Sequence, residues 1–514
     1  MRHPFRFVAG LALLAAPTVL AQPAFRVQET TIADIHAAFR AGRLTCRALV
    51  QSYLDRIDKY DKKGPGINAI TVVNPDALAI ADSLDRGFRA GRQLTGPLHC
   101  IPIVVKDNME TIGLQTAAGS LALKGYAPLH DAFQVQRIKA AGAIVIAKSN
   151  MAEFAFSPYE TVNSLLPGYT KNPYALDRVT AGSSGGTAAA VAANFGEIGL
   201  GTDTGNSIRG PSSHNALVGI RSTMGLTSRA GVVPLNLFAD IAGPMGRTVT
   251  DAVTVFQVIA GYDPNDPATE TSRSRPIPNY ASALVRDGLR GARLGVLRQA
   301  YERPTLDSEV VQVFARAMGD LRRAGATVLD SVAVPQLDSL LRLGRGGCNV
   351  FKSELNRWLG AQGDRVPVKS LDEILRSNRY HPGIQKRLEV AQAVEQSPDS
   401  NPACQARQRT RDAVRTAVTR LMDSLRLDAL IYPTWSNVPR LIGDLNTPHG
   451  DNSQLFSPQT GMPAVNVPMG YTRNNTLPSG LQLLGRAFDE ATLFKLAYSY
   501  EQATKHRRAP VSAP

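Results

Sequence analysis

Two glycine-rich turns, each holding a serine, constrain this chain more than any other feature of its sequence. The first covers residues 182–186 (Gly-Ser-Ser-Gly-Gly), and the second covers residues 203–211 (Asp-Thr-Gly-Asn-Ser-Ile-Arg-Gly-Pro). Glycine permits backbone angles that other residues avoid, and such turns leave N–H groups exposed, as the binding of a developing oxyanion requires. Ser183 in the first turn and Ser207 in the second therefore predict a nucleophile and a proton relay.

A serine hydroxyl is a weak nucleophile and needs a base. Lys106 ends the apolar run Ile101–Val105, which predicts a buried strand with the lysine at its end. Burial disfavours the ammonium form and lowers the pKa of lysine, which makes the neutral amine available as a base. We expect Lys106 to be that base; the alternative is a structural lysine paired with Asp107.

Two other serine-hydrolase arrangements fit the sequence less well. Residues 182–186 match Gly-x-Ser-x-Gly with Ser184 in the centre, but that motif requires a strand leading directly into the turn. The preceding segment, 170–178, is polar and contains Pro173, which favours a loop. A Ser-x-x-Lys pair on one helical turn is excluded, because no lysine has a serine three residues before it.

The two turns resemble the paired serine motifs of the amidase signature family of serine hydrolases. Residues 97–108 resemble the lysine strand of that family, and further agreement is found at residues 147–154, 170–173, 461–468 and 500–503. The resemblance covers nearly the whole chain after residue 21 and is weakest from about Leu306 to Arg426. Asn206 and Cys100 depart from it, because each stands where the family usually has glycine.

The resemblance implies a role for each site residue. Ser207 attacks the amide carbonyl, and Ser183, which follows a cis peptide bond in the family, passes the proton to neutral Lys106. Ser184 orients this relay, while Asp203 and Arg209 brace the second turn. The oxyanion hole is formed by the backbone N–H groups of Thr204, Gly205, Asn206 and Ser207. No cofactor or metal is expected, since the eight histidines lack a His-Glu-x-x-His motif and no phosphate loop is present.

Helical and strand patterns alternate along the chain and predict an α/β fold. Helices are expected at residues 31–41, 46–60, 75–90, 131–141, 307–324 and 489–504. Strands are expected at residues 69–73, 101–105, 143–147, 198–202, 293–297, 327–332, 428–432, 464–468 and 481–485. The family resemblance implies a mixed central sheet covered by helices on both faces. We expect one domain from 22 to 514, with a mostly helical region at about 335–426 covering one edge of the active site.

The N-terminus predicts export. Arg2 and Arg6 precede an apolar run that is too short to span a bilayer, and Val19-Leu20-Ala21 fits a signal-peptide cleavage site. The net charge of +14 is spread along the chain without an aromatic-rich basic stripe, so nucleic acid is not an expected partner, and neither is a membrane after cleavage. Cys348 and Cys404 are candidates for a disulfide, whereas Cys100 is expected to be a buried small residue.

These features favour an exported amidase that hydrolyses a small-molecule or peptide amide to an acid and ammonia or an amine. Within the family, the signal peptide and the long helical region are most similar to enzymes that deamidate peptide C-termini. One alternative is the glutaminase subunit of an amidotransferase complex, which the signal peptide opposes. An esterase or carbamate hydrolase is a further alternative, because the same acyl-enzyme route serves both bonds. A catalytically inactive binding protein would not need Lys106, Ser183 and Ser207 together.

Overall fold

The computed structural model describes residues 25–157, 160–343 and 348–514. The expected signal peptide, residues 1–21, lies outside the described residues. The centre of the molecule is an eleven-stranded sheet with the order β1-β3-β2-β6-β8-β7-β12-β13-β11-β9-β10, and β4 and β5 form a separate two-stranded sheet. The strands are β1 (Ile70–Val73), β2 (Pro102–Lys106), β3 (Ile144–Ser149), β4 (Lys171–Asn172), β5 (Ala175–Val179), β6 (Ile198–Asp203), β7 (Val218–Arg221), β8 (Ile241–Gly246), β9 (Arg293–Leu297), β10 (Thr327–Val332), β11 (Ala429–Pro433), β12 (Ala464–Thr472) and β13 (Leu477–Leu484).

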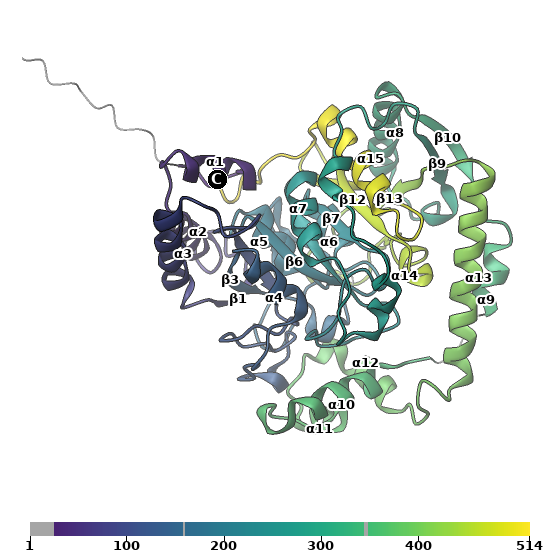
Figure 1. Cartoon of the computed structure of the whole chain (residues 1–514). Coiled ribbons are helices and arrows are strands. Elements are labelled where there is room, and N and C mark those ends of the chain that lie inside the picture. Colours follow the sequence, from purple (N-terminus) through teal and green to yellow (C-terminus); the bar gives the residue numbers. More distant parts are fainter. Residues whose placement is uncertain (1–24, 158–159, 344–347) are drawn as a thin grey trace, which may run out of the picture.

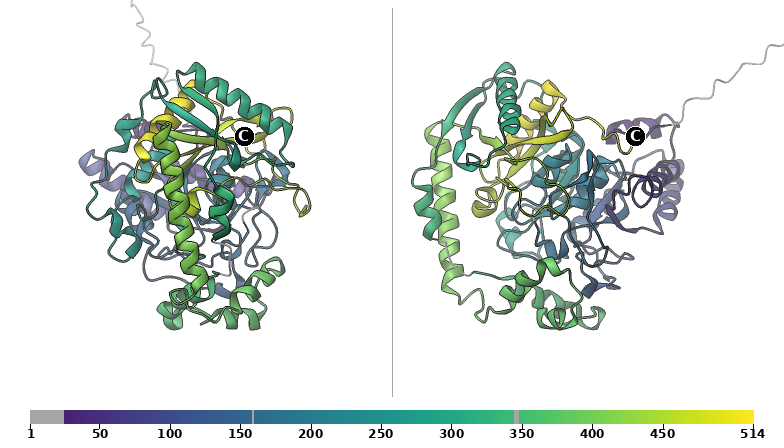
Figure 2. Two further views of the ribbon diagram at one scale, coloured as in Figure 1. Left: turned by 90° about the vertical axis from the view of Figure 1, so that its right-hand side faces the viewer. Right: turned by 180° about the vertical axis from the view of Figure 1, so that it is seen from behind.

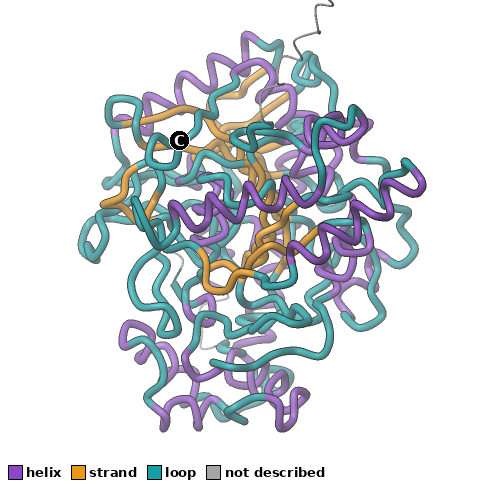
Figure 3. The backbone as a smooth tube through the Cα atoms, turned by 90° about the vertical axis from the view of Figure 1, so that its left-hand side faces the viewer, coloured by secondary structure: helices purple, strands orange, loops and turns teal. Residues whose placement is uncertain are grey.

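Helices cover both faces of this sheet (Figures 1 and 3). They are α1 (Ile32–Arg40), α2 (Cys46–Tyr60), α3 (Ala77–Gly91), α4 (Phe133–Ala140), α5 (Gly185–Ala192), α6 (Arg209–His214), α7 (Val249–Ile259), α8 (Ser308–Arg323), α9 (Leu337–Leu343), α10 (Phe351–Gln362), α11 (Leu371–Ser377), α12 (Gln385–Gln392), α13 (Pro402–Ser424), α14 (Ser457–Thr460) and α15 (Glu490–Thr504). The sheet is mixed: β2 is parallel to β3 and β6, whereas β6, β8 and β7 are antiparallel neighbours. The predicted α/β fold with a mixed central sheet is confirmed.

Two strands and two helices in the middle of the fold were not predicted from sequence. They are α6, β7, β8 and α7, which lie at the end of the second serine turn and after it. β8 contains Gly243, Pro244 and Gly246, residues that normally interrupt strands, yet it lies in the interior of the sheet and pairs with both β6 and β7. Burial on both sides and pairing with two neighbours outweigh its poor intrinsic β propensity.

The approach to the first serine turn also differs from expectation. The predicted polar loop at 170–178 contains the hairpin of β4 and β5, which pair in antiparallel fashion around Pro173. The hairpin stands outside the main sheet, so no strand of the central sheet leads into the turn. The loop prediction was therefore wrong in detail, because two short strands pair locally around the proline.

The helical region after residue 335 forms the outer wall of one side of the molecule. The long helix α13 runs along this side, and α10, α11 and α12 lie together at one of its ends (Figures 1 and 2). Cys348, just before α10, forms the expected disulfide with Cys404 in the first turn of α13, with Cα atoms 4.7 Å apart. This bond ties the α10–α12 segment to the long helix.

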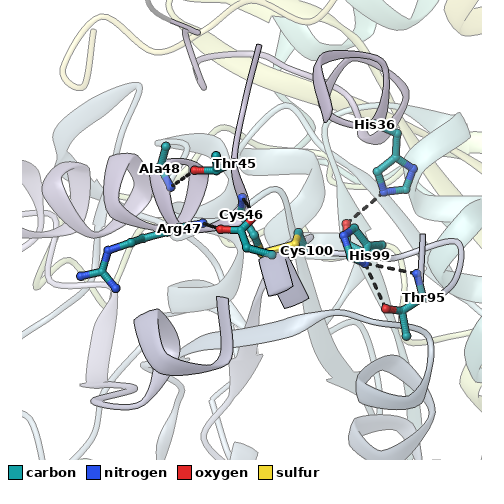
Figure 4. Close-up of a disulfide and its surroundings, with 9 residues drawn as sticks. His36, Thr45, Cys46, Arg47, Ala48, Thr95, His99 and Cys100 are labelled. Atoms are coloured by element: carbon teal, nitrogen blue, oxygen red, sulfur yellow. Dashed lines mark hydrogen bonds between the residues drawn. A yellow bond between two sulfur atoms is a disulfide. The ribbon is translucent and has the colours of Figure 1, made fainter. Parts of the chain in front are cut away.

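A second disulfide was missed from sequence. Cys100 is buried as expected, but its sulfur is bonded to Cys46 at the start of α2 (Figure 4), with Cα atoms 5.5 Å apart. The adjacent His99 carbonyl accepts a hydrogen bond from Nε2 of His36 in α1, at 3.0 Å. Residues far apart in sequence meet here only because α1 and α2 pack against the loop before β2. No described helix is both long and apolar enough to cross a bilayer.

Candidate active site

The first serine turn lies between β5 and α5. The peptide bond from Gly182 to Ser183 is cis, as the family resemblance implied, and α5 begins directly after Ser184. The turn is tightly enclosed: a Cβ atom at Gly182 would lie 2.5 Å from the carbonyl oxygen of Ser157 and 2.6 Å from that of Glu160. Real Cβ atoms do not approach oxygen so closely, so glycine is required here for close packing.

Lys106 points from the end of β2 into this turn. Its Nζ donates to Ser183 Oγ at 2.8 Å and to Thr202 Oγ1 at 2.7 Å, and the lysine is fully buried. The alternative pairing with Asp107 is wrong: an Asp107 carboxylate oxygen instead accepts the N–H of Gly119 at 2.9 Å. Because successive side chains of a strand point to opposite faces, Lys106 and Asp107 separate at the end of β2.

The surroundings of Lys106 change its acidity strongly. Burial lowers the pKa of Lys106 from its ordinary 10.5 to about 7, although the negative charges of Asp203 and Asp240 act in the opposite direction. A lysine with that pKa is roughly half neutral at pH 7, whereas an unperturbed lysine is almost entirely protonated. The buried amine can therefore accept a proton from Ser183 near neutral pH.

Ser207 lies in the second turn, between β6 and α6. Its backbone carbonyl accepts the N–H of Ser184 at 3.3 Å, so the two serine turns are in direct contact. The Ser207 residue is 3% exposed and lines a cavity. Its hydroxyl makes no hydrogen bond to any other described residue. A hydroxyl without a protein partner at the wall of a cavity is available to a bound substrate.

The backbone of the second turn supplies donors at the same place. Thr204, Gly205 and Ser207 all line the cavity, and none of their N–H groups donates to another described residue. Backbone donors without protein acceptors beside a cavity are suited to hold a developing oxyanion. Asn206 lines the same cavity, is buried, and does not have a positive φ angle. The backbone at this position therefore does not require glycine, which is the residue that the family usually has here.

A buried ion triad supports the second turn. Asp203 contacts Arg209 at 3.0 Å and Arg221 at 2.9 Å, and all three side chains are fully buried. Burial alone would raise the pKa of Asp203, but the two guanidinium groups hold it well below its ordinary value. Asp203 also accepts the N–H of Ile208 at 3.1 Å, and Arg209 donates to the Gly205 carbonyl at 2.6 Å. The triad therefore fixes the backbone on both sides of Ser207.

Ser184 has surroundings unlike those of a nucleophile. Its hydroxyl donates to the Thr202 carbonyl at 3.1 Å and accepts the Thr202 N–H at 3.3 Å, and the residue is fully buried. The Ser184 hydroxyl is thus engaged both as a donor and as an acceptor by backbone groups. Ser184 also does not line the cavity beside Ser207. This geometry opposes the Gly-x-Ser-x-Gly arrangement with Ser184 as its centre.

Sequence reasoning missed three residues that complete the site. Thr202 receives the Lys106 hydrogen bond and a second one from Asn108, at 3.1 Å. Asp240 accepts the hydroxyl of Thr204 at 2.6 Å. Thr202 and Asn108 are near the recognised motifs, so proximity to them was an available signal. Asp240 lies just before the unpredicted strand β8, and no signal in the sequence marked it.

The cavity in front of Ser207 has a volume of about 300 Å³. Its lining combines the second serine turn with residues of the helical region, which are Asn349, Phe351, Arg387, Arg407 and Arg411. The expectation that this region borders the active site agrees with that lining. Among the described residues, no group of histidine, cysteine or acidic side chains is arranged to hold a metal ion.

Comparisons with known proteins show which family this chain resembles over most of its length. A family model described as Amidase matches residues 48–494. A probable amidase of Arabidopsis thaliana is 34% identical over 506 residues, covering 95% of this chain and 92% of the relative. A glutamyl-tRNA(Gln) amidotransferase component from Symbiobacterium thermophilum is 34% identical, covering 93% of this chain and 97% of its own. The solved structure of native peptide amidase from Stenotrophomonas maltophilia is 36% identical, with a TM-score of 0.83, covering 94% of this chain and 98% of its own.

Proposed function

This chain belongs to the amidase signature family and hydrolyses amide carbon–nitrogen bonds, and we propose that it is an exported, free-standing amidase working through a Ser207 acyl-enzyme. The observation that carries the proposal is the hydrogen bond of 2.8 Å between buried Lys106 and Ser183, next to a cavity lined by Ser207. The pKa of Lys106, lowered to about 7, makes this lysine a usable base. The likeness to a peptide amidase supports an amide of a small molecule or peptide as substrate.

In the proposed acylation step, Ser207 Oγ forms a bond to the carbonyl carbon of the amide. The proton of Ser207 moves to Ser183, whose own proton moves to neutral Lys106. The negative charge on the carbonyl oxygen is held by backbone N–H groups of the second turn, and one such donor contributes about 3–4 kcal/mol to transition-state stabilisation. The carbon–nitrogen bond then breaks, and the leaving nitrogen takes a proton from the Lys106 ammonium through Ser183.

In the deacylation step, water takes the place of the departed ammonia or amine and attacks the acyl-enzyme. The water molecule gives its proton to Lys106 through Ser183. The resulting hydroxide attacks the acyl carbon, and the oxyanion again lies against the second turn. Collapse returns a proton to Ser207 Oγ and releases the carboxylic acid, so the enzyme is restored without a cofactor.

The proposed mechanism predicts that activity rises as pH increases through about 7. Lys106 acts as a base only when neutral, and burial lowers its pKa to about 7. Below that pH, kcat/KM for a neutral amide should increase about tenfold per pH unit, and above it the curve should level off. The measurement is the pH profile of kcat/KM between about pH 5 and 9. A profile that still rises tenfold per unit at the alkaline end would contradict this role for Lys106.

Export is a separate part of the proposal and rests on the N-terminal sequence. A signal peptide of residues 1–21 is supported by Arg2, Arg6 and the apolar run that ends before Gln22. Its removal would leave residues 22–514, which we expect to form a single domain. The protein would then act in a periplasm or outside the cell. N-terminal sequencing of material recovered from outside the cytoplasm should give a chain beginning at Gln22; recovery of the intact chain in the cytoplasm alone would contradict export.

The decisive test of function uses the purified chain without partners. It should release ammonia or an amine from members of a panel of aliphatic amides, aryl amides, anilides and peptide C-terminal amides. A fluorophosphonate probe followed by peptide mass spectrometry should modify Ser207 and no other serine. Modification of Ser184 would favour the Gly-x-Ser-x-Gly arrangement instead.

The same panel separates the alternatives. Relatives named as components of glutamyl-tRNA(Gln) amidotransferase make a glutaminase subunit the second candidate. That candidate requires that glutamine alone be hydrolysed, and only in the presence of a partner protein. Esters and carbamates belong in the panel as well, because an alkoxide leaves more easily than an amine and the acyl-enzyme route serves both.

A further inference from the structure

The cavity beside Ser207 has an unusual balance of charge. Its described lining includes three arginines, Arg387 on α12 and Arg407 and Arg411 on α13, and no aspartate or glutamate. The remaining polar groups of the lining are hydroxyls, amides and backbone groups. A cavity of about 300 Å³ with this lining suits a small ligand that carries a negative charge.

Arg411 is the most informative of these residues. It is only 8% exposed, and it makes no hydrogen bond or ion pair with any other described residue. Burial lowers the pKa of Arg411 to about 10, and the positive charges of Arg221, Arg407 and Arg415 act in the same direction. The guanidinium nevertheless stays charged at neutral pH. A buried cation without a partner is costly, so a ligand anion that paired with Arg411 would remove a penalty present in the empty protein.

The neighbouring charged groups leave this cation without a counterion. Asp412 is the carboxylate that favours the charged form of Arg411, but it forms an ion pair with Arg415 at 2.5 Å. Arg221 is paired with Asp203 beneath the serine turn. Arg407 makes one long hydrogen bond, of 3.4 Å, to the carbonyl of Cys348. Arg411 and Arg407 both belong to the lining of the cavity beside Ser207. Arg411 also lines a neighbouring cavity with Glu354 and Asp399, but neither carboxylate forms an ion pair with it.

The position of these arginines is fixed by covalent and helical structure. Arg407 and Arg411 lie one helical turn apart on α13, so they lie on the same face of that helix. The Cys348–Cys404 disulfide joins the start of α13 to the segment that carries Asn349, which also lines the cavity. The two arginines and the second serine turn thus line the same small cavity.

We propose that this cavity selects amides that carry a carboxylate, with Arg411 and Arg407 binding the carboxylate while the amide carbonyl lies at Ser207. This inference rests on the proposed amidase function and adds the class of substrate. A planar guanidinium can bind both oxygens of a carboxylate, and such charge-assisted hydrogen bonds are stronger than neutral ones. The substrates are monoamides of short dicarboxylic acids and other small amides with one acidic group.

The test compares charged and neutral amides of matched length. Ammonia release is measured with the monoamides of succinic, glutaric and adipic acid, and with the corresponding diamides and unbranched alkanamides. The wild-type chain should hydrolyse at least one monoamide with a kcat/KM roughly tenfold or more above that of its neutral analogues. Equal or better hydrolysis of the neutral amides would overturn the proposal.

Substitution of Arg411 identifies the group responsible. Arg411→Gln should lower kcat/KM for the preferred monoamide roughly 10- to 100-fold, mainly through KM, and should lower kcat/KM for neutral amides far less, so that the preference for the monoamide is lost. Arg407→Gln should act in the same direction. The matched control is Arg409→Gln, since Arg409 lies on the same helix, is exposed and does not line the cavity; its kinetics should not change. An equal loss for charged and neutral amides would mean that Arg411 acts on the fold, and the proposal would fall.

A binding measurement separates this inference from the amidase proposal itself. Glutarate should bind the Ser207→Ala protein in a calorimetric titration, and the Ser207→Ala, Arg411→Gln protein should bind it at least tenfold more weakly. If the wild-type chain hydrolyses no amide but glutarate binding depends on Arg411, the anion site stands and the proposed function fails. If amides are hydrolysed and glutarate binding does not depend on Arg411 or Arg407, the carboxylate site is wrong. Thermal unfolding of each variant shows whether it is folded, and Arg407→Gln provides the same test if Arg411→Gln is not.

Discussion

Replacing Ser207 with alanine is expected to reduce kcat for amide hydrolysis by roughly 10⁴- to 10⁶-fold, because the atom that forms the acyl-enzyme is lost. Ser183→Ala and Lys106→Ala should each cost several orders of magnitude as well. In the proposed mechanism the three residues form one proton-transfer unit, and Lys106 contacts Ser183 at 2.8 Å. The Ser183→Ala, Lys106→Ala double variant should therefore be little worse than either single variant. The measurement is single-turnover or steady-state kcat on the best amide of the panel.

Ser184→Ala is the matched control for this series. Ser184 follows Ser183 directly, but its hydroxyl bonds only to the backbone of Thr202, so loss of that hydroxyl should reduce kcat by about tenfold at most. Circular dichroism and thermal unfolding should show that all variants are folded. Near wild-type activity in Ser207→Ala, or multiplied losses in the double variant, would reject the proposed relay.

Replacing Asp203 with asparagine is expected to destabilise the fold strongly. The substitution removes the charge that Arg209 and Arg221 share and leaves two buried guanidinium groups without a counterion. Breaking a buried ion pair in this way costs about 3–5 kcal/mol in the free energy of unfolding. The measurement is denaturant-induced unfolding at pH 7, compared with Asp58→Asn, which removes an exposed carboxylate paired with Lys63. The control should show no detectable change.

The pH dependence of this effect has a defined sign. The arginines hold the pKa of Asp203 well below its ordinary value, so its stabilising contribution is complete above that ordinary pKa, near 3.9, and is lost as pH falls toward the folded-state value. The stability difference between wild type and Asp203→Asn should thus be full at pH 7 and shrink in acid. Asp203 also raises the pKa of Lys106, so Asp203→Asn should move the rise of the activity profile to lower pH. A stability difference independent of pH would contradict the ion-triad interpretation.

Much of the secondary structure could be predicted from local pattern. Strands β9 and β10 and helix α2 have the expected bounds, because each combines a clear hydrophobic period with a clear boundary signal. At α2 that signal is Thr45, whose side chain accepts the Ala48 N–H. β8 was missed because Gly243, Pro244 and Gly246 give it the local signature of a turn. Its strand conformation comes from pairing with β6 and β7, which a local pattern does not contain.

The candidate site divides in the same way. The glycine–serine turns and the apolar run before Lys106 are contiguous in sequence, so the residues that meet there could be predicted. The proposed carboxylate site could not be predicted from sequence, because Arg407 and Arg411 are two of several arginines on α13 and nothing in the local sequence distinguishes them. Only their place in the cavity that Ser207 lines, and the absence of an ion-pair partner for Arg411 among the described residues, distinguish these two from exposed neighbours such as Arg409.

The sequence by itself determined the α/β class, the two serine turns and the identity of the buried lysine, since each depends on short-range backbone and hydrophobic constraints. The tertiary structure decided how acidic that lysine is, which N–H groups of the second turn are left without an acceptor beside a cavity, and that Cys46 meets Cys100. These properties arise from burial and from contacts between segments far apart in the chain. Desolvation and long-range charge act through space, so they are set by the packed fold and not by neighbours in sequence.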